Sequence, residues 1–158
     1  MDLGVYADAI LINTQPFLQD RMLSSDQDIE ILTKICECLH NNGYKIVLKL
    51  HPREKNLERY AGLKKFVVIA KGQAISQEAL LANIEVAPKA IIGFSSTTLV
   101  TAKLFFDLPT ISLVQFWDLD ALNPKFRMEQ EQFLKTFSNI VACPNSLEAL
   151  FQVLSEKT

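Results

Sequence analysis

The sequence lacks the features of a membrane-spanning, secreted or nucleic-acid-binding protein. None of its apolar runs approaches the roughly 20 residues that cross a bilayer as a helix. Segment 1–6 has neither a basic start nor a long apolar run, so we expect no signal peptide. The 16 Lys and Arg residues are outnumbered by 18 Asp and Glu residues. Without a basic excess to neutralise a phosphate backbone, we expect no nucleic-acid partner.

Cysteine is scarce, and the three copies, Cys36, Cys38 and Cys143, are an odd number. Cys36 and Cys38 lie two residues apart in a helical pattern, where neighbours at this spacing do not face each other. The spacing argues against a metal pair and against a disulfide. The cysteines therefore predict reduced thiols in a cytoplasmic protein.

Short apolar runs alternate with helical patterns along all 158 residues. Continuous apolar strands separated by helices are typical of a parallel sheet covered on both faces. We therefore expect one α/β domain, residues 1–158, with a doubly wound, mainly parallel six-stranded Rossmann-like sheet. The expected strands are 9–12, 44–50, 66–70, 90–94, 110–114 and 140–142, and the expected helices are 24–41, 76–86, 97–106, 124–137 and one after Asn145. Ser24 with Gln27, and Asn145 with Glu148, are predicted to cap the first and last of these helices.

The two histidines of the chain differ in their surroundings. His51 directly follows an apolar run, Pro52 favours extended backbone before it, and Lys49 and Arg53 flank it with positive charge. In open α/β sheets, ligands bind at the carboxyl ends of strands. A histidine there can donate a hydrogen bond or a proton to an anion, although a buried histidine that only satisfies a hydrogen bond is the commoner case. His40 lies late in a helical pattern and is predicted to be a surface or capping residue.

A second polar cluster, Ser95, Ser96, Thr97 and Thr98, lies between a predicted strand and a predicted helix. Backbone N–H groups and the positive end of the helix dipole favour an anion at a helix N-terminus, and hydroxyls add donors. A plain N-cap explains any one of these hydroxyls equally well, because Ser and Thr are common caps. The cluster lacks the glycine and lysine spacing of a P-loop or a dinucleotide-binding fold. Together with His51 it predicts a site for a phosphorylated ligand.

Three weaker candidates lie near these segments. Glu78 falls in the first turn of a predicted helix, where an acid is favourable to the dipole without any further role. Thr14 and Gln15 follow the first predicted strand and either line the same crevice or form a plain turn. The pattern Asp-x-Asp occurs at 26–28 and at 118–120. Two copies in so short a chain show how weak the motif is, and we assign no metal site to it.

Segments 49–52 and 94–97 resemble the His-Pro and Ser-Ser motifs of bacterial sialyltransferases, and segment 12–16 resembles the first-strand segment of their donor domain. The resemblance is closest to the lipooligosaccharide sialyltransferase and polysialyltransferase families, and it runs from Ala9 to the end of the chain. It implies the C-terminal, donor-binding half of a GT-B fold. It further implies an inverting transfer from CMP-sialic acid without a metal or other cofactor, in capsule or lipooligosaccharide synthesis.

The resemblance also implies roles for individual residues. His51 would be the catalytic residue that contacts the phosphate of CMP-sialic acid and hydrogen-bonds or protonates the departing CMP. Ser95, Ser96 and Thr97 would hold the same phosphate, and Glu78 would bind the ribose hydroxyls. The remaining donor-binding residues would be Lys49, Pro52, Thr14, Gln15 and Gly72, the last in a loop that would pass the cytosine.

The family has two Rossmann-like domains, and the general base for the acceptor belongs to the N-terminal one. We therefore expect a missing N-terminal domain to hold the glycan acceptor, and no full catalysis from this chain alone. An open crevice would leave apolar surface uncovered and favour a homodimer. Peripheral attachment of the full enzyme to the inner face of the bacterial membrane is left open. Two alternatives remain: a CDP-polyol phosphotransferase-type GT-B domain, and a non-catalytic α/β domain that binds a partner protein.

Overall fold

A parallel sheet forms the centre of the molecule. The structure is a computed structural model that describes residues 2–70 and 75–156. In these two ranges the sheet has five strands, β1 (Ile10–Asn13), β2 (Ile46–Lys49), β3 (Val68–Ile69), β4 (Ala90–Gly93) and β5 (Thr110–Ser112). Their order is β3-β2-β1-β4-β5, and every pairing is parallel. The chain therefore moves outward from the middle strand β1 first on one side and then on the other.

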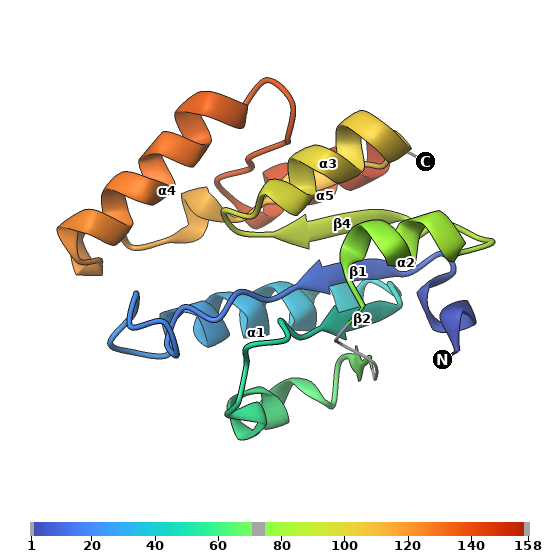
Figure 1. Ribbon diagram of the computed structural model, residues 1–158, viewed down its shortest axis with the longest axis horizontal. Coiled ribbons are helices and arrows are strands. Elements are labelled where there is room, and N and C mark those ends of the chain that lie inside the picture. Colours follow the sequence, from blue (N-terminus) through green and yellow to red (C-terminus); the bar gives the residue numbers. More distant parts are fainter. Residues whose placement is uncertain (1, 71–74, 157–158) are drawn as a thin grey trace.

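Helices cover both faces of this sheet. The α-helices are α1 (Gln27–Asn41), α2 (Gln77–Asn83), α3 (Thr97–Phe106), α4 (Pro124–Phe137) and α5 (Leu147–Glu156), and the 3-10 helices are η1 (Leu3–Tyr6), η2 (Leu57–Leu63), η3 (Val114–Phe116) and η4 (Leu119–Ala121). Figure 1 shows α1 behind the sheet and α2 and α3 in front of it, as right-handed crossovers require for this strand order. Figure 1 also shows α4 beyond the carboxyl ends of β1 and β4.

The core lies on both sides of the strands. Every residue of β2 and β4 is buried, which explains why β4 is apolar throughout and β2 is apolar up to its last residue, Lys49. Helix α1 packs an apolar stripe on the sheet, because Leu32, Ile35, Cys36 and Leu39 are each at most 1% exposed. Burying one such Leu or Ile side chain stabilises the fold by about 1.5–3 kcal/mol. No helix in the described part of the chain is both long and apolar enough to cross a membrane.

Local sequence fixes the bounds of the two helices closest to the strand ends. Ser96 is the N-cap of α3, and Asp107 ends this helix in the left-handed region at φ 50°. Asn123 is the N-cap of α4, where its side chain accepts a hydrogen bond from the Phe126 N–H, and Pro124 takes the first helical position. The predicted bounds 97–106 and 124–137 are therefore confirmed.

Helix α2 ends at Asn83 and not at the expected residue 86, and three further predictions about the elements are wrong. The expected sixth strand at 140–142 is only a single bridge between Ala142 and Ile111, because the N–H groups of Ile140 and Val141 bond back to the Phe137 carbonyl at the end of α4. The expected box of Ser24 with Gln27 does not form. The Gln27 side chain instead accepts a hydrogen bond from the distant Asp118 N–H at 2.8 Å, and α1 starts at Gln27 itself.

The third wrong prediction concerns the last helix. The hydroxyl that caps the start of α5 belongs to Ser146, whose Oγ accepts a hydrogen bond from the Ala149 N–H at 3.1 Å. The predicted cap, Asn145, lies one residue further from the helix. Both Asn and Ser are good caps, so the sequence pattern fitted either start.

Candidate functional site

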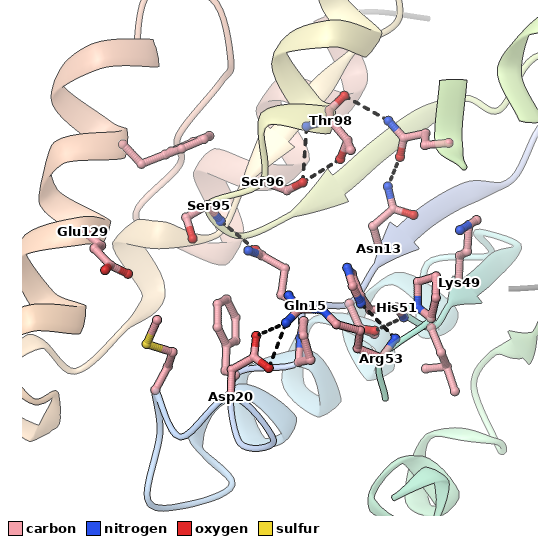
Figure 2. Close-up of a pocket in the computed structure, with 18 of the residues that line it drawn as sticks. Asn13, Gln15, Asp20, Lys49, His51, Arg53, Ser95, Ser96, Thr98 and Glu129 are labelled. Carbon is pink, nitrogen blue, oxygen red and sulfur yellow. Dashed lines mark hydrogen bonds and ion pairs between the residues drawn. The ribbon is translucent and has the colours of Figure 1, made fainter. Parts of the chain in front are cut away.

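A cavity of about 610 Å³ lies at the carboxyl edge of the sheet (Figure 2). Its walls come from the segments that follow β1, β2 and β4, from the start of α2, and from one face of α4. At β1 the strand order reverses, so the loops after its two neighbours diverge and leave a crevice between them. A ligand was expected at this edge of the sheet, and the cavity lies there.

His51 is held in this crevice through its backbone and its ring. The His51 N–H donates to Oγ1 of Thr14 at 2.9 Å, which ties the end of β2 to the end of β1. The backbone N–H of Arg53 donates to Nδ1 of His51 at 3.1 Å. A nitrogen that accepts a hydrogen bond carries no proton, so the neutral ring has its proton on Nε2.

The surroundings of His51 favour this neutral form. Burial lowers the pKa of His51 below its ordinary value, and the positive charges of Arg53 and Lys49 lower it further. The Asp20 carboxylate acts in the opposite direction, but it is already paired with Arg53 at 2.9 Å. His51 is therefore a neutral hydrogen-bond donor at neutral pH rather than an imidazolium.

A buried lysine adds positive charge beside His51. Lys49, the last residue of β2, is only 7% exposed. Burial lowers the pKa of Lys49, and the Glu78 carboxylate on α2 partly offsets this change. Lys49 has no carboxylate within ion-pair distance among the described residues. A ligand with a negative charge would supply the missing partner.

The opposite wall is the start of α3. The Ser96 side chain accepts a hydrogen bond from the Thr98 N–H at 3.2 Å and shares another with Oγ1 of Thr98 at 2.7 Å, so the cap interpretation is confirmed for Ser96. None of the described hydrogen bonds uses the backbone N–H of Ser96 or Thr97. These two free donors lie at the positive end of the α3 dipole, which is the arrangement that binds anions at helix starts.

Two consecutive residues after β1 connect the two walls. Thr14, through its hydroxyl, holds the backbone of His51, as described above. Gln15 reaches the other way, and its Oε1 accepts a hydrogen bond from the Ser95 N–H at 2.9 Å (Figure 2). The amide Nε2 of Gln15 has no partner among the described hydrogen bonds and adds a donor to the pocket.

A chain of side-chain amides supports the far end of the pocket. Asn13 donates to Oε1 of Gln77, and Nε2 of Gln77 donates to the Thr98 carbonyl at 2.9 Å. Asn13 and Gln77 were missed by the sequence analysis. A signal existed for Asn13, since a polar residue closes the apolar run of β1, but the partner of Gln77 lies 21 residues away and nothing in the sequence indicated it.

Helix α4 forms the outer wall, and its contribution was also missed. Two phenylalanines of this helix, Phe126 and Phe133, are buried in the core and also line the pocket. Glu129 and Gln130 lie on the same face of α4 as these rings. Figure 2 shows Glu129 on the opposite side of the pocket from His51 and Lys49.

Most of the predicted site residues meet in this pocket. The residues that line it are His51, Lys49, Pro52, Glu78, Ser95, Ser96, Thr14 and Gln15. Thr97 does not line it, because the first position of α3 turns this side chain to solvent, and Thr98 lines the pocket in its place. Gly72 lies outside the described residues. Within the described residues, no group of three or more His, Cys, Asp or Glu side chains is arranged to hold a metal ion.

The chain was compared with known proteins. No curated protein matches it. The model of one family, alpha-2,8-polysialyltransferase (POLYST), matches residues 2–115. The matched range contains all five strands and the three strand-end segments with His51, Ser95 and Gln15, and it stops before α4. Because the match covers well over half of the chain, the chain belongs to the alpha-2,8-polysialyltransferase family.

Proposed function

We propose that this chain is the donor-binding domain of a sialyltransferase and that the pocket binds CMP-sialic acid. Membership of the polysialyltransferase family supports a sialyltransferase-type glycosyltransferase. The five-stranded parallel sheet with helices on both faces is compatible with a doubly wound, Rossmann-like half of a GT-B fold. The ligand crevice of such a half lies where the strand order reverses, and this is where the pocket is.

One observation carries the proposal: donors from two separate strand ends face a single cavity. His51 and Lys49 come from the end of β2, and Ser95 and Ser96, with the free N–H of Ser96, come from the end of β4. A phosphate has several acceptor oxygens and a negative charge, so it can use both sets at once. An uncharged ligand would leave buried Lys49 without a partner.

The chemistry of sialyl transfer fits these groups. The bond between the sugar and the phosphate breaks, and negative charge grows on the departing CMP. Donors that are already in place stabilise this charge without reorganisation. We propose that Nε2–H of His51 donates to the phosphate, that Ser95 and the start of α3 bind the same group, and that Glu78 binds the ribose.

The acceptor glycan would be bound by a second domain that faces the open side of the pocket. We propose that this second domain supplies the base that activates the acceptor hydroxyl, that transfer inverts the sugar, and that the reaction needs no metal ion. We further propose that the enzyme works in the cytoplasm. The present chain would bind the donor but would transfer sialic acid only together with its second domain.

Calorimetric titration with CMP-sialic acid, CMP, CDP, UDP and cytidine tests the proposal. We expect CMP and CMP-sialic acid to bind, and cytidine to bind much more weakly, because the phosphate makes the main contacts. Replacing His51 or Ser95 with Ala removes a hydrogen bond to a charged group. Such bonds contribute about 1.5–3 kcal/mol, so each variant should bind CMP about 10- to 100-fold more weakly.

Matched controls exist for both variants. His40 is the only other histidine, it is exposed on α1, and His40→Ala should bind CMP normally. Ser138, the exposed C-cap residue that follows α4, provides the corresponding serine control. A preference for CDP would favour a polyol-phosphate transferase instead, and a preference for UDP, or a His51→Ala variant that binds CMP as well as the wild type, would contradict the proposal.

A further inference from the structure

A buried glutamine on α4 connects the pocket to the only tryptophan of the chain. Gln130 is 2% exposed and makes two hydrogen bonds. Its Oε1 accepts from the indole Nε1–H of Trp117 at 3.0 Å, and its Nε2 donates to Oγ of Ser95 at 3.1 Å. The three side chains thus form a line from the interior of the molecule to the pocket.

The chemistry of these groups allows only one direction along this line. An indole N–H can donate but never accept, so the atom of Gln130 that faces Trp117 must be the amide oxygen. The atom that faces Ser95 is then the amide nitrogen, which has no lone pair to offer. The Ser95 oxygen must therefore accept this bond, and its own hydrogen remains available for another acceptor.

The backbone of Ser95 cannot take over this task. Its N–H is already bonded to Oε1 of Gln15 at 2.9 Å. The hydroxyl is thus the group through which Ser95 can donate to a ligand. Among the described hydrogen bonds, Oγ of Ser95 has no partner except Gln130.

Aromatic packing keeps the tryptophan in the required orientation. The Trp117 ring stacks on Phe94 with ring centres 4.6 Å apart, and it packs edge-on against Phe17 and Phe126 at 5.6 and 5.4 Å. Trp117 itself is 5% exposed. The indole N–H therefore has little freedom to turn away from Gln130.

We infer that Gln130 is a positioning residue that makes the Ser95 hydroxyl a dedicated hydrogen-bond donor to an oxyanion in the pocket. The inference deepens the proposed function and rests on it for the identity of the donor. The direction of the bonds rests only on the contacts of Trp117, Gln130 and Ser95. The ligand group selected is one that accepts hydrogen bonds, such as a phosphate oxygen, over one that donates them.

A double-mutant cycle tests this inference. Gln130→Glu keeps the shape but presents only acceptors, so the Ser95 hydroxyl should turn to the carboxylate and away from the ligand. We expect CMP affinity to fall by about tenfold or more, the effect of a lost bond to a charged group. The part of this loss that depends on the hydroxyl should vanish when Ser95 is already Ala. Trp117→Phe, which frees the amide to turn over, should show the same coupling to Ser95→Ala.

Gln132→Glu is the matched control for the added charge. Gln132 lies on the same helix and lines the same pocket, but its amide bonds to Thr136 rather than to Ser95. Its effect on CMP affinity should be the same with Ser95 or Ala at position 95. If the effects of Gln130→Glu and Ser95→Ala are simply additive, Gln130 is a packing residue only and the inference is overturned.

A second measurement follows the signal of Trp117 instead of the affinity for CMP. Trp117 is the only tryptophan, so it gives a single indole N–H signal in an NMR spectrum. Titrating the wild type with inorganic phosphate or CMP should move this signal through Gln130, and the shift should be lost in Ser95→Ala. In one outcome, the Trp117 signal shifts with inorganic phosphate only when Ser95 is present, while the protein shows no preference for CMP. This result would support the positioning role and contradict the proposed donor. A signal unmoved by any phosphate-containing probe would overturn the positioning role.

Discussion

The loop that carries His51 rests on ionised side chains, whereas the strand end that carries Ser95 rests on neutral amide and aromatic groups. Beneath the His51 loop, Arg59 pairs with Asp28 at 2.7 Å, and its Nη1 lies 3.9 Å from Glu54. All three side chains are at most 5% exposed. Beside Ser95, the supporting groups are Gln130 and Trp117, which carry no charge.

The charged support reaches the His51 loop through Glu54. The Glu54 N–H donates to the His51 carbonyl at 2.9 Å, and its carboxylate accepts a hydrogen bond from the Tyr60 hydroxyl at 2.5 Å. Tyr60 is fully buried. The position of His51 therefore depends on a cluster of buried charges that are stable only together.

Mutations in the charged support and in the neutral support should have different effects. A buried charge that loses its partner destabilises the whole fold, whereas a neutral amide that loses a partner changes the direction of one hydrogen bond. We therefore expect variants of the charged support to show in unfolding experiments and in their pH dependence. Variants of the neutral support should show mainly in ligand binding.

The largest effect is expected for Arg59→Met. This change leaves Asp28 and Glu54 buried without their cation, and breaking a buried pair in this way costs about 3–5 kcal/mol. Urea unfolding measures the loss. Lys103→Met is the control, because the exposed pair of Lys103 with Asp107 on α3 should contribute less than about 0.5 kcal/mol. Equal losses from the two variants would mean that the Arg59 cluster is not a buried structural unit.

A smaller effect is expected in the pH dependence of stability. Burial raises the pKa of Glu54 above its ordinary value of 4.5, so the folded state binds the proton more tightly than the unfolded state does. The free energy of unfolding should therefore fall as the pH rises from about 4.5 through the folded pKa, by at most about 1.4 kcal/mol per pH unit for this group. Glu54→Gln can still accept from Tyr60 and should flatten this slope.

The neutral groups beside Ser95 provide the comparison for this change of stability with pH. Gln130→Met removes no titrating group, so it should shift the stability curve without changing its slope with pH. The buried Asp28, whose pKa burial also raises, keeps a part of the slope in Glu54→Gln. A wild-type slope that survives unchanged in Glu54→Gln would show that Glu54 is not the group responsible.

The smallest effect is expected for the pH dependence of binding. A bound phosphate adds negative charge beside His51 and raises its lowered pKa, so phosphate affinity should increase as the pH falls toward the pKa of the ring, which lies below its ordinary value in the free protein. The half-buried ring is partly screened, and the increase should stay below about tenfold per pH unit. His51→Gln should remove it, whereas Ser95→Ala should weaken binding equally at each pH. A slope that persists in His51→Gln would assign it to the ligand or to another group.

The strand ends of this fold could be predicted from sequence because each is marked locally. An apolar run followed by a polar residue placed Thr14, His51 and Ser95 at one sheet edge, and these residues do line one pocket. The bounds of two helices, 97–106 and 124–137, were predicted to the residue, and the structure shows Ser96 and Asn123 as their caps. Such signals need only a few neighbouring residues, so one sequence is enough to see them.

The supports of the site could not be predicted, because their partners are distant in the chain. Gln130 lies 35 residues from Ser95 and 13 from Trp117, and Arg59 lies 31 residues from Asp28. Glutamine and arginine are common on surfaces, so nothing in the sequence marked Gln130 and Arg59 as buried. The strand expected at 140–142 could not be judged from sequence for the same reason. Only the pairing with Ile111 in the structure shows that Ala142 alone joins the sheet.

Thr14 and Gln15 tie the positions of the two pocket walls to each other. Successive side chains of an extended chain point to opposite sides, and these two hold the His51 loop and the Ser95 strand end by one hydrogen bond each. Each wall is thus attached to the same two-residue segment through one side chain and one hydrogen bond. Any movement of this segment would shift the backbone N–H groups of His51 and Ser95 together, so the two sides of the anion site share one mechanical support.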